Sequence, residues 1–76
     1  MAITMYTTQT CPYCFAAKDL LASKGLVFIE YDVSFNVKLK TKLLEKTGRR
    51  TVPQIFIDEE HIGGFIDLQR YFNERH

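Results

Sequence analysis

The strongest constraint on this chain is a change of sequence period at Pro12, where a strand pattern gives way to a helix pattern. Residues 2–6 alternate in the manner of a strand with one buried face. Apolar side chains then follow helical spacing until Gly25, which predicts a helix over residues 12–24. An apolar run over residues 26–31 is typical of a strand covered on both faces. Strand, helix and strand in this order predict a right-handed parallel βαβ unit.

The middle of the chain predicts a second helix over residues 36–47. Every fourth residue on one side is a lysine, at positions 38, 42 and 46, which indicates a solvated face. Lys40 falls within the apolar arc, where its methylenes can cover the core while its ammonium reaches water. The apolar face consists of Val37, Leu39, Leu43 and Leu44.

The remaining residues predict a hairpin and a last helix. Residues 54–57 have the pattern of a short strand, and an acidic turn over 58–60 leads into a second strand at 61–62. The glycine pair at 63–64 ends this pattern, and Asp67 is the predicted N-cap of the last helix. The apolar face of that helix consists of Leu68, Tyr71 and Phe72. With no repeat or linker, residues 1–76 are expected to form one domain.

Length and charge exclude several classes of protein. A chain of 76 residues is near the size at which many domains need a disulfide framework, a metal or a partner. The ten basic and nine acidic side chains nearly cancel, so no net field attracts nucleic acid or a membrane. No apolar run has the length of a membrane span, and the first ten residues do not resemble a signal peptide. We expect a monomeric cytoplasmic protein with no nucleic-acid or membrane partner.

The two cysteines, Cys11 and Cys14, form a CPYC motif where the first strand has ended and the first helix begins. A disulfide across so short a loop would stabilise the fold by only about 2 kcal/mol. At the N-cap, the sulfur of Cys11 faces free N–H groups and the positive end of the helix dipole, which favour a thiolate. Cys11 is therefore the predicted nucleophile. Cys14, inside the first turn and more buried, is the predicted resolving thiol.

Two other interpretations of the cysteines carry less weight. A zinc site would need further ligands, and His61 and His76 have a spacing that matches no common zinc arrangement. Two buried structural cysteines are also disfavoured, because a helix N-terminus is a poor place to hide a thiol. Both histidines are interpreted as surface residues, so redox chemistry remains the main hypothesis.

The sequence resembles the dithiol glutaredoxins over nearly its whole length. The resemblance is carried by Tyr6-Thr7, by CPYC at 11–14, by Thr51-Val52-Pro53, and by Gly63-Gly64 followed by Asp67. It implies a thioredoxin-like α/β fold, a four-stranded mixed sheet with helices on both faces in the order β-α-β-α-β-β-α. It also implies reduction of protein disulfides and glutathionyl mixed disulfides. Glutathione would be the reducing co-substrate, with no tightly bound cofactor.

The same resemblance implies where glutathione binds. The Val52–Pro53 peptide bond would be cis, and the Val52 backbone would pair with the cysteine of glutathione. Without the resemblance a trans bond would be expected, because most peptide bonds before proline are trans. Free N–H groups at the start of the last helix would receive the γ-glutamyl carboxylate, and Asp67 its ammonium. The implied contact residues are Tyr13, Thr51, Val52, Pro53, Gly64, Phe65, Ile66 and Asp67.

Two departures from the family pattern keep other functions open. Where the family usually has a lysine for the glycine carboxylate of glutathione, this chain has Thr8, and Arg49 or Arg50 are the candidate substitutes. Gly64-Phe65 resembles small redoxins that donate electrons to ribonucleotide reductase and are recharged by thioredoxin reductase. A further hypothesis is a dimeric module that binds an iron–sulfur cluster, which Pro12 disfavours. Another is a scaffold protein in which the thiols have no role.

Overall fold

The structure, a computed structural model, describes residues 1–74 of the chain. In chain order its elements are β1 (Ile3–Thr7), α1 (Pro12–Ser23), β2 (Ile29–Asp32), α2 (Val37–Thr47), β3 (Gln54–Ile57), β4 (Glu60–Gly63) and α3 (Phe65–Glu74). The predicted order of strands and helices is therefore confirmed. Within the described part of the chain, no helix is long and apolar enough to cross a membrane.

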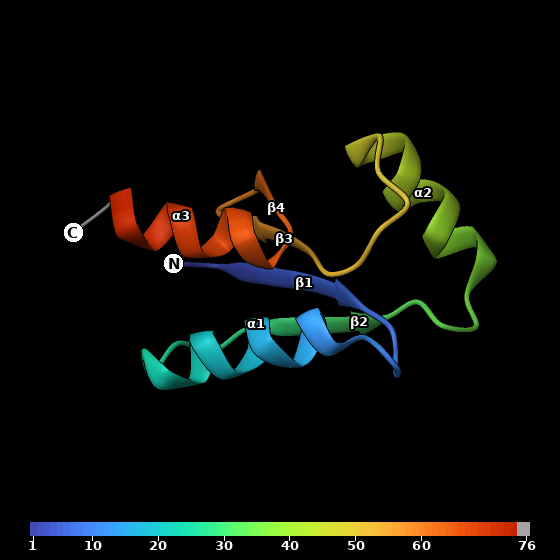
Figure 1. The fold of residues 1–76 in the computed structure, drawn as a ribbon. Helices are drawn as coiled ribbons and strands as arrows, with labels where there is room; N and C mark the ends of the chain where they lie inside the picture. The colour runs from blue at the N-terminus through green and yellow to red at the C-terminus, as the bar shows by residue number, and fades with distance from the viewer. Residues whose placement is uncertain (75–76) are drawn as a thin grey trace.

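The four strands form one mixed sheet in the order β2-β1-β3-β4. β1 pairs with β2 in parallel, whereas β3 is antiparallel to both β1 and β4. The parallel pair with α1 between its strands is the predicted βαβ unit. α1 and α3 lie side by side against the sheet, and α2 stands apart from them near the carboxyl end of β1 (Figure 1). A mixed sheet with helices on both faces is thus confirmed.

The core lies between the sheet and the pair formed by α1 and α3. Alternate residues of β1 are buried, as the strand pattern predicts. Tyr71 and Phe72 of α3 pack against this core and confirm the apolar face predicted for the last helix. The fully enclosed cluster consists of Ile3, Met5, Ala17, Leu21, Ile55, Ile57 and Leu68.

The strand predicted over residues 26–31 is shorter and more exposed than expected. Only Ile29–Asp32 form β2, and all four of these residues are exposed. β2 is an edge strand, and among residues 1–74 no strand other than β1 pairs with it, so its outer edge has no neighbouring strand there. Leu26 and Phe28 pack against the core, but the side chain of Val27 is 86% exposed. The prediction of a strand covered on both faces was wrong, because an apolar run does not show which strand lies at an edge.

α2 confirms the predicted helix but not all of its apolar face. Asn36 is its N-cap and accepts a hydrogen bond from the Leu39 N–H at 3.0 Å, and Gly48 ends it with a φ of 70°. Leu43 is buried in this helix, whereas Val37 is 76% exposed, so its assignment to the buried face was wrong. α2 stands clear of the main core, which leaves its first turn in solvent. The lysines at 38, 42 and 46 are exposed, as predicted.

Candidate active site

Cys11 occupies the N-cap of α1, as predicted. Its backbone is extended, with φ −111° and ψ 105°, and Pro12 follows as the first helical residue. The Cys14 N–H donates a hydrogen bond to the Cys11 sulfur at 3.1 Å. An N–H donor at a helix start is the kind of contact that stabilises a negatively charged sulfur. The local sequence therefore places the sulfur of Cys11, the predicted nucleophile, at the start of α1.

The sulfur of Cys11 also faces the loop that precedes β3. The thiol donates a hydrogen bond to the Val52 carbonyl oxygen at 3.4 Å. The peptide bond between Val52 and Pro53 is cis, which confirms what the family resemblance implied. Through its contact with Cys11, the backbone of Val52 lies beside the predicted nucleophile, where a bound peptide could pair with it.

Cys14 is more buried than Cys11, as predicted for a resolving thiol. The exposed fraction is 0% for Cys14 and 8% for Cys11, and the two thiols are not joined. Burial raises the pKa of the Cys14 thiol to about 12, and its hydrogen bond with Cys11 adds to this effect. Cys14 is thus a neutral thiol near pH 7. Because both cysteines are largely buried, the expectation that a helix start does not hide a thiol was wrong.

All eight residues proposed from the resemblance to contact glutathione line one cleft of about 300 Å³. They come from the start of α1, the loop before β3 and the start of α3. Tyr13 and Phe65 stack across it, with their ring centroids 6.1 Å apart. The full lining is Tyr13, Arg49, Thr51, Val52, Pro53, Gly64, Phe65, Ile66 and Asp67. Three separate motifs of the sequence therefore meet beside Cys11.

Asp67 is the third residue of α3 and not its N-cap, so that prediction was wrong. Gly64 is the capping residue, because its carbonyl accepts the first helical hydrogen bond, from the Leu68 N–H at 2.9 Å. Asp67 Oδ2 reaches back to the Gly64 N–H at 2.9 Å and pairs with Arg49 Nη1 at 3.1 Å. The Gly64 N–H, and after it Arg49, lower the pKa of Asp67. The carboxylate is therefore ionised and already holds two donors.

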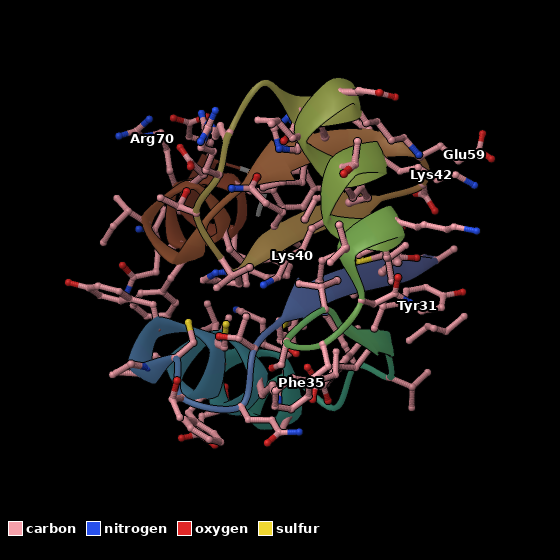
Figure 2. All side chains as sticks on the ribbon, turned by 90° about the vertical axis from the view of Figure 1, so that its right-hand side faces the viewer. Tyr31, Phe35, Lys40, Lys42, Glu59 and Arg70 are labelled. Atoms are coloured by element: carbon pink, nitrogen blue, oxygen red, sulfur yellow. The ribbon has the colours of Figure 1, made fainter. Side chains whose placement is uncertain are left out.

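A second, basic cleft of about 390 Å³ adjoins the first and shares Arg49 and Val52 with it. Its lining is Thr8, Val33, Lys40, Thr41, Leu43, Leu44, Arg49, Arg50 and Val52. Thr8, which replaces the family lysine, lies here together with Arg50 and Lys40. Figure 2 shows Lys40 and Lys42 on opposite sides of α2, with Lys42 pointing outward. No functional role was predicted for Lys40, although a lysine inside the apolar arc of the helix indicated that its ammonium lies near the rest of the fold.

His61 and Gln54 form a hydrogen-bonded pair that the sequence did not predict. Gln54 is fully buried, and its side-chain amide donates a hydrogen bond to the Thr51 carbonyl oxygen at 2.9 Å. Its Oε1 lies 2.7 Å from Nε2 of His61. His61 is half-buried, so its assignment to the surface was wrong; burial, and next Arg49, lower its pKa. His76 lies outside the described residues. Among residues 1–74, no group of three or more His, Cys, Asp or Glu side chains could hold a metal ion.

Comparisons of sequence with known proteins agree with this geometry. The family model described as Glutaredoxin matches residues 3–62. Glutaredoxin 3 of Escherichia coli K12 is 50% identical over 66 residues, which cover 87% of this chain and 80% of that protein. A glutaredoxin of Pseudomonas aeruginosa is 47% identical over 66 residues, which cover 87% of this chain and 79% of that protein.

Solved structures show the same fold. The solution structure of glutaredoxin from Brucella melitensis matches with a TM-score of 0.84 and 44% identity, covering 99% of this chain and 82% of that one. A crystal structure of a buckwheat glutaredoxin–glutathione complex matches with a TM-score of 0.87 and 27% identity, covering 95% and 68%. The thioredoxin-like fold is thus confirmed, and this chain belongs to the glutaredoxin family of thiol–disulfide oxidoreductases.

Proposed function

We propose that this chain is a glutathione-dependent oxidoreductase that reduces protein disulfides and glutathionyl mixed disulfides, as a monomer in the cytoplasm. The observation that carries this proposal is the position of the Cys11 sulfur. It lies at a helix start, 3.4 Å from the Val52 carbonyl oxygen, and Val52 lines a cleft of about 300 Å³. The buckwheat relative was crystallised with glutathione, which supports the same ligand for this cleft.

With a glutathionyl substrate, one thiol of the protein is sufficient. The Cys11 thiolate attacks the glutathione sulfur, and the substrate leaves as a thiolate that takes up a proton. A second glutathione thiolate then attacks the glutathione bonded to Cys11. Glutathione disulfide leaves and the Cys11 thiolate is restored, so the two electrons come from glutathione.

With a protein disulfide, both cysteines take part. The Cys11 thiolate attacks one sulfur of the substrate and forms a mixed disulfide. Cys14 then loses its proton and attacks the Cys11 sulfur, and the substrate leaves as a dithiol. The resulting Cys11–Cys14 disulfide is reduced by two glutathiones. We infer disulfides of cytoplasmic enzymes, ribonucleotide reductase among them, as the substrate class.

The cleft offers a partner for each part of the γ-glutamyl-cysteinyl end of glutathione. The Val52 backbone can pair with the cysteine in the manner of an added strand. Phe65 and Ile66 are the first residues of α3, whose N–H groups have no acceptor within the helix and can receive the γ-glutamyl carboxylate. The Asp67 carboxylate can accept hydrogen bonds from the γ-glutamyl ammonium, and the Tyr13 ring lines one side of the cleft.

The glycine carboxylate of glutathione is best matched by Arg50 and Lys40. Both line the basic cleft beside Val52, and neither forms an ion pair within the described part of the chain. Arg49 is the weaker candidate, because its guanidinium already pairs with Asp67. A partly exposed ion pair of this kind is worth up to about 1 kcal/mol, or roughly a fivefold change in affinity.

Two cysteine variants test the proposed function. Cys11→Ser is expected to abolish both reactions, because it removes the nucleophile. Cys14→Ser is expected to keep deglutathionylation of a small substrate and to lose most reduction of a protein disulfide. Both rates are followed with glutathione and glutathione reductase. Any activity that survives Cys11→Ser would contradict the assignment of the nucleophile.

Two charge variants test the glutathione assignment separately. Arg50→Ala and Lys40→Ala are expected to weaken glutathione binding by up to about fivefold each, with an effect that shrinks at high salt. Lys42→Ala is the matched control, since Lys42 lies on the opposite side of α2 from Lys40 (Figure 2). If neither variant changes the deglutathionylation rate and thioredoxin reductase recharges the protein efficiently, the glutathione assignment fails. The function as an electron donor to ribonucleotide reductase would then replace it.

A further inference from the structure

Lys18 places a positive charge beside the resolving cysteine. It lies four residues after Cys14 in α1, so both side chains project from the same face of the helix. Side chains in this relation have their Cβ atoms about 5 to 6 Å apart. Cys14 is fully buried, whereas Lys18 is half-buried. The next turn of the helix therefore carries a cation on the same face as a fully buried thiol.

The ammonium of Lys18 is tethered in place by the sheet. Its Nζ pairs with Glu30 Oε2 of β2 at 2.5 Å. The same carboxylate oxygen accepts a hydrogen bond from the buried hydroxyl of Thr7 in β1 at 2.7 Å. Burial would raise the pKa of Glu30, but the hydrogen bonds from Lys18 and Thr7 lower it overall. Glu30 is therefore ionised at neutral pH, and two strands and one helix hold the cation.

The resolving step needs a thiolate at Cys14, but the surroundings of Cys14 favour the neutral thiol. Burial is the largest effect that raises the pKa of Cys14, followed by Cys11; the Thr8 backbone and Lys18 act in the opposite direction. Cys11 and Lys18 are the ionisable groups that act on the Cys14 thiol. Glu30 and Asp32, both on β2, interact in turn with Lys18.

We propose that Lys18, held by Glu30 and Thr7, is a positioning residue for the resolving step and stabilises the Cys14 thiolate as it forms. In this step the Cys14 proton goes to solvent, the Cys14–Cys11 S–S bond forms, and the mixed S–S bond breaks. The substrate leaves as a thiolate and takes up a proton. The inference rests on the proposed function, in which Cys14 resolves mixed disulfides of protein substrates.

The experiment removes the charge and measures the resolving step alone. Each reduced variant is mixed rapidly with a protein disulfide, and the formation and decay of the mixed disulfide with Cys11 are followed in a single turnover by acid quenching from pH 6 to 9. Lys18→Gln is expected to slow release about threefold to tenfold below the wild-type rate, the range that Coulomb's law gives for charges on neighbouring side chains in a partly solvated site. Lys18→Arg keeps the charge and is expected to restore release to within about twofold.

Two controls separate this effect from a structural role. Lys24→Gln removes the same charge at the far end of α1, where the Lys24 ammonium lies over the Phe72 ring, and should not slow release. Deglutathionylation of a small substrate does not use Cys14, so its rate should be unchanged in Lys18→Gln. Lys18→Met, which keeps the methylenes without the charge, repeats the measurement if the glutamine variant does not fold.

The outcomes are distinguishable. Release at the wild-type rate in folded Lys18→Gln, or an equal loss in deglutathionylation, would overturn the role of Lys18. Cys14→Ser is assayed alongside: if it keeps full reduction of protein disulfides, the proposed function itself fails. If Cys14→Ser loses that activity while Lys18→Gln matches Lys24→Gln, the inference about Lys18 alone is wrong.

Discussion

Replacing Asp67 by alanine tests how the start of α3 is stabilised. The carboxylate accepts from the Gly64 N–H at 2.9 Å, which is one half of a capping box. It also pairs with Arg49 at 3.1 Å. Alanine removes both contacts and leaves the Gly64 N–H without its acceptor. We therefore expect Asp67→Ala to lower the free energy of unfolding.

The magnitude follows from the two contacts. A capping interaction contributes about 1 to 2 kcal/mol, and an ion pair as exposed as that with Arg49 contributes about 0.2 to 1 kcal/mol. The expected loss for Asp67→Ala is about 2 kcal/mol. For a domain of this size, that loss lowers the melting temperature by roughly 8 to 16 °C. Asp67→Asn keeps an oxygen acceptor for Gly64 but has no charge, so about half of this loss is expected.

The loss should depend on pH in a defined direction. Hydrogen bonding to Gly64 and pairing with Arg49 lower the pKa of Asp67 in the folded protein below the unfolded value of about 3.9. The stabilisation is therefore fully present above that unfolded value. It is lost as the pH falls through the lower, folded pKa. In strong acid the wild type is expected to converge on Asp67→Asn.

Urea unfolding, followed by circular dichroism at pH 7 and at steps down to pH 2, measures these differences. Arg49→Ala is the matched control, because it removes only the ion pair and should cost less than about 1 kcal/mol. Arg70→Ala should be nearly neutral, since Arg70 lies 3.9 Å from Asp67 and is more exposed. An Asp67→Ala loss under about 0.5 kcal/mol at pH 7, or one that stays constant to pH 2, would refute the reasoning.

Three further predictions concern the turn at Gly63, the buried thiol of Cys14 and the hydrogen bonds of Gln54. Gly63→Ala should cost more than about 2 kcal/mol by thermal unfolding, because φ is 121° and the new Cβ would lie 2.4 Å from Asp67 Oδ2; Gly25→Ala, with open space around it, should cost about 1. In Cys11→Ser, Cys14 should resist alkylation at pH 7 until urea is added, as mass spectrometry can show. Gln54→Leu should destabilise by about 1 to 3 kcal/mol and weaken glutathione binding, measured by urea unfolding and calorimetry.

The parts of the site that depend on local backbone chemistry were predictable from the sequence. Pro12 after Cys11 marks a helix start, and a helix start fixes where an N-cap sulfur lies. The order of strands and helices follows from apolar periods that each span only a few residues. The cis bond at Val52–Pro53 and the shared cleft needed the family resemblance, because no local rule brings residues 13, 52 and 67 together.

The parts that depend on distant neighbours were not predictable. An apolar run does not show that β2 has no strand on its outer side, so the exposure of Val27 was missed. Asp67 is a residue type that favours the N-cap, but the turn at Gly63 and Gly64 begins the helix three residues earlier than an N-cap at Asp67 would require. Gln54 lies in a strand pattern, and only the fold brings His61 within 2.7 Å of it.

The distribution of charge around the two clefts indicates where the affinity for glutathione depends on salt. Asp67 and Arg49 neutralise each other at one end, and the γ-glutamyl group that we place there carries one charge of each sign. The glycine carboxylate at the other end is an unbalanced anion, and it meets Arg50 and Lys40, which have no ion-pair partners among residues 1–74. Screening by salt acts on unbalanced charges in partly exposed sites. The salt dependence of glutathione binding should therefore decrease in Arg50→Ala and Lys40→Ala and stay nearly unchanged in Arg49→Ala, as titrations at several salt concentrations can determine.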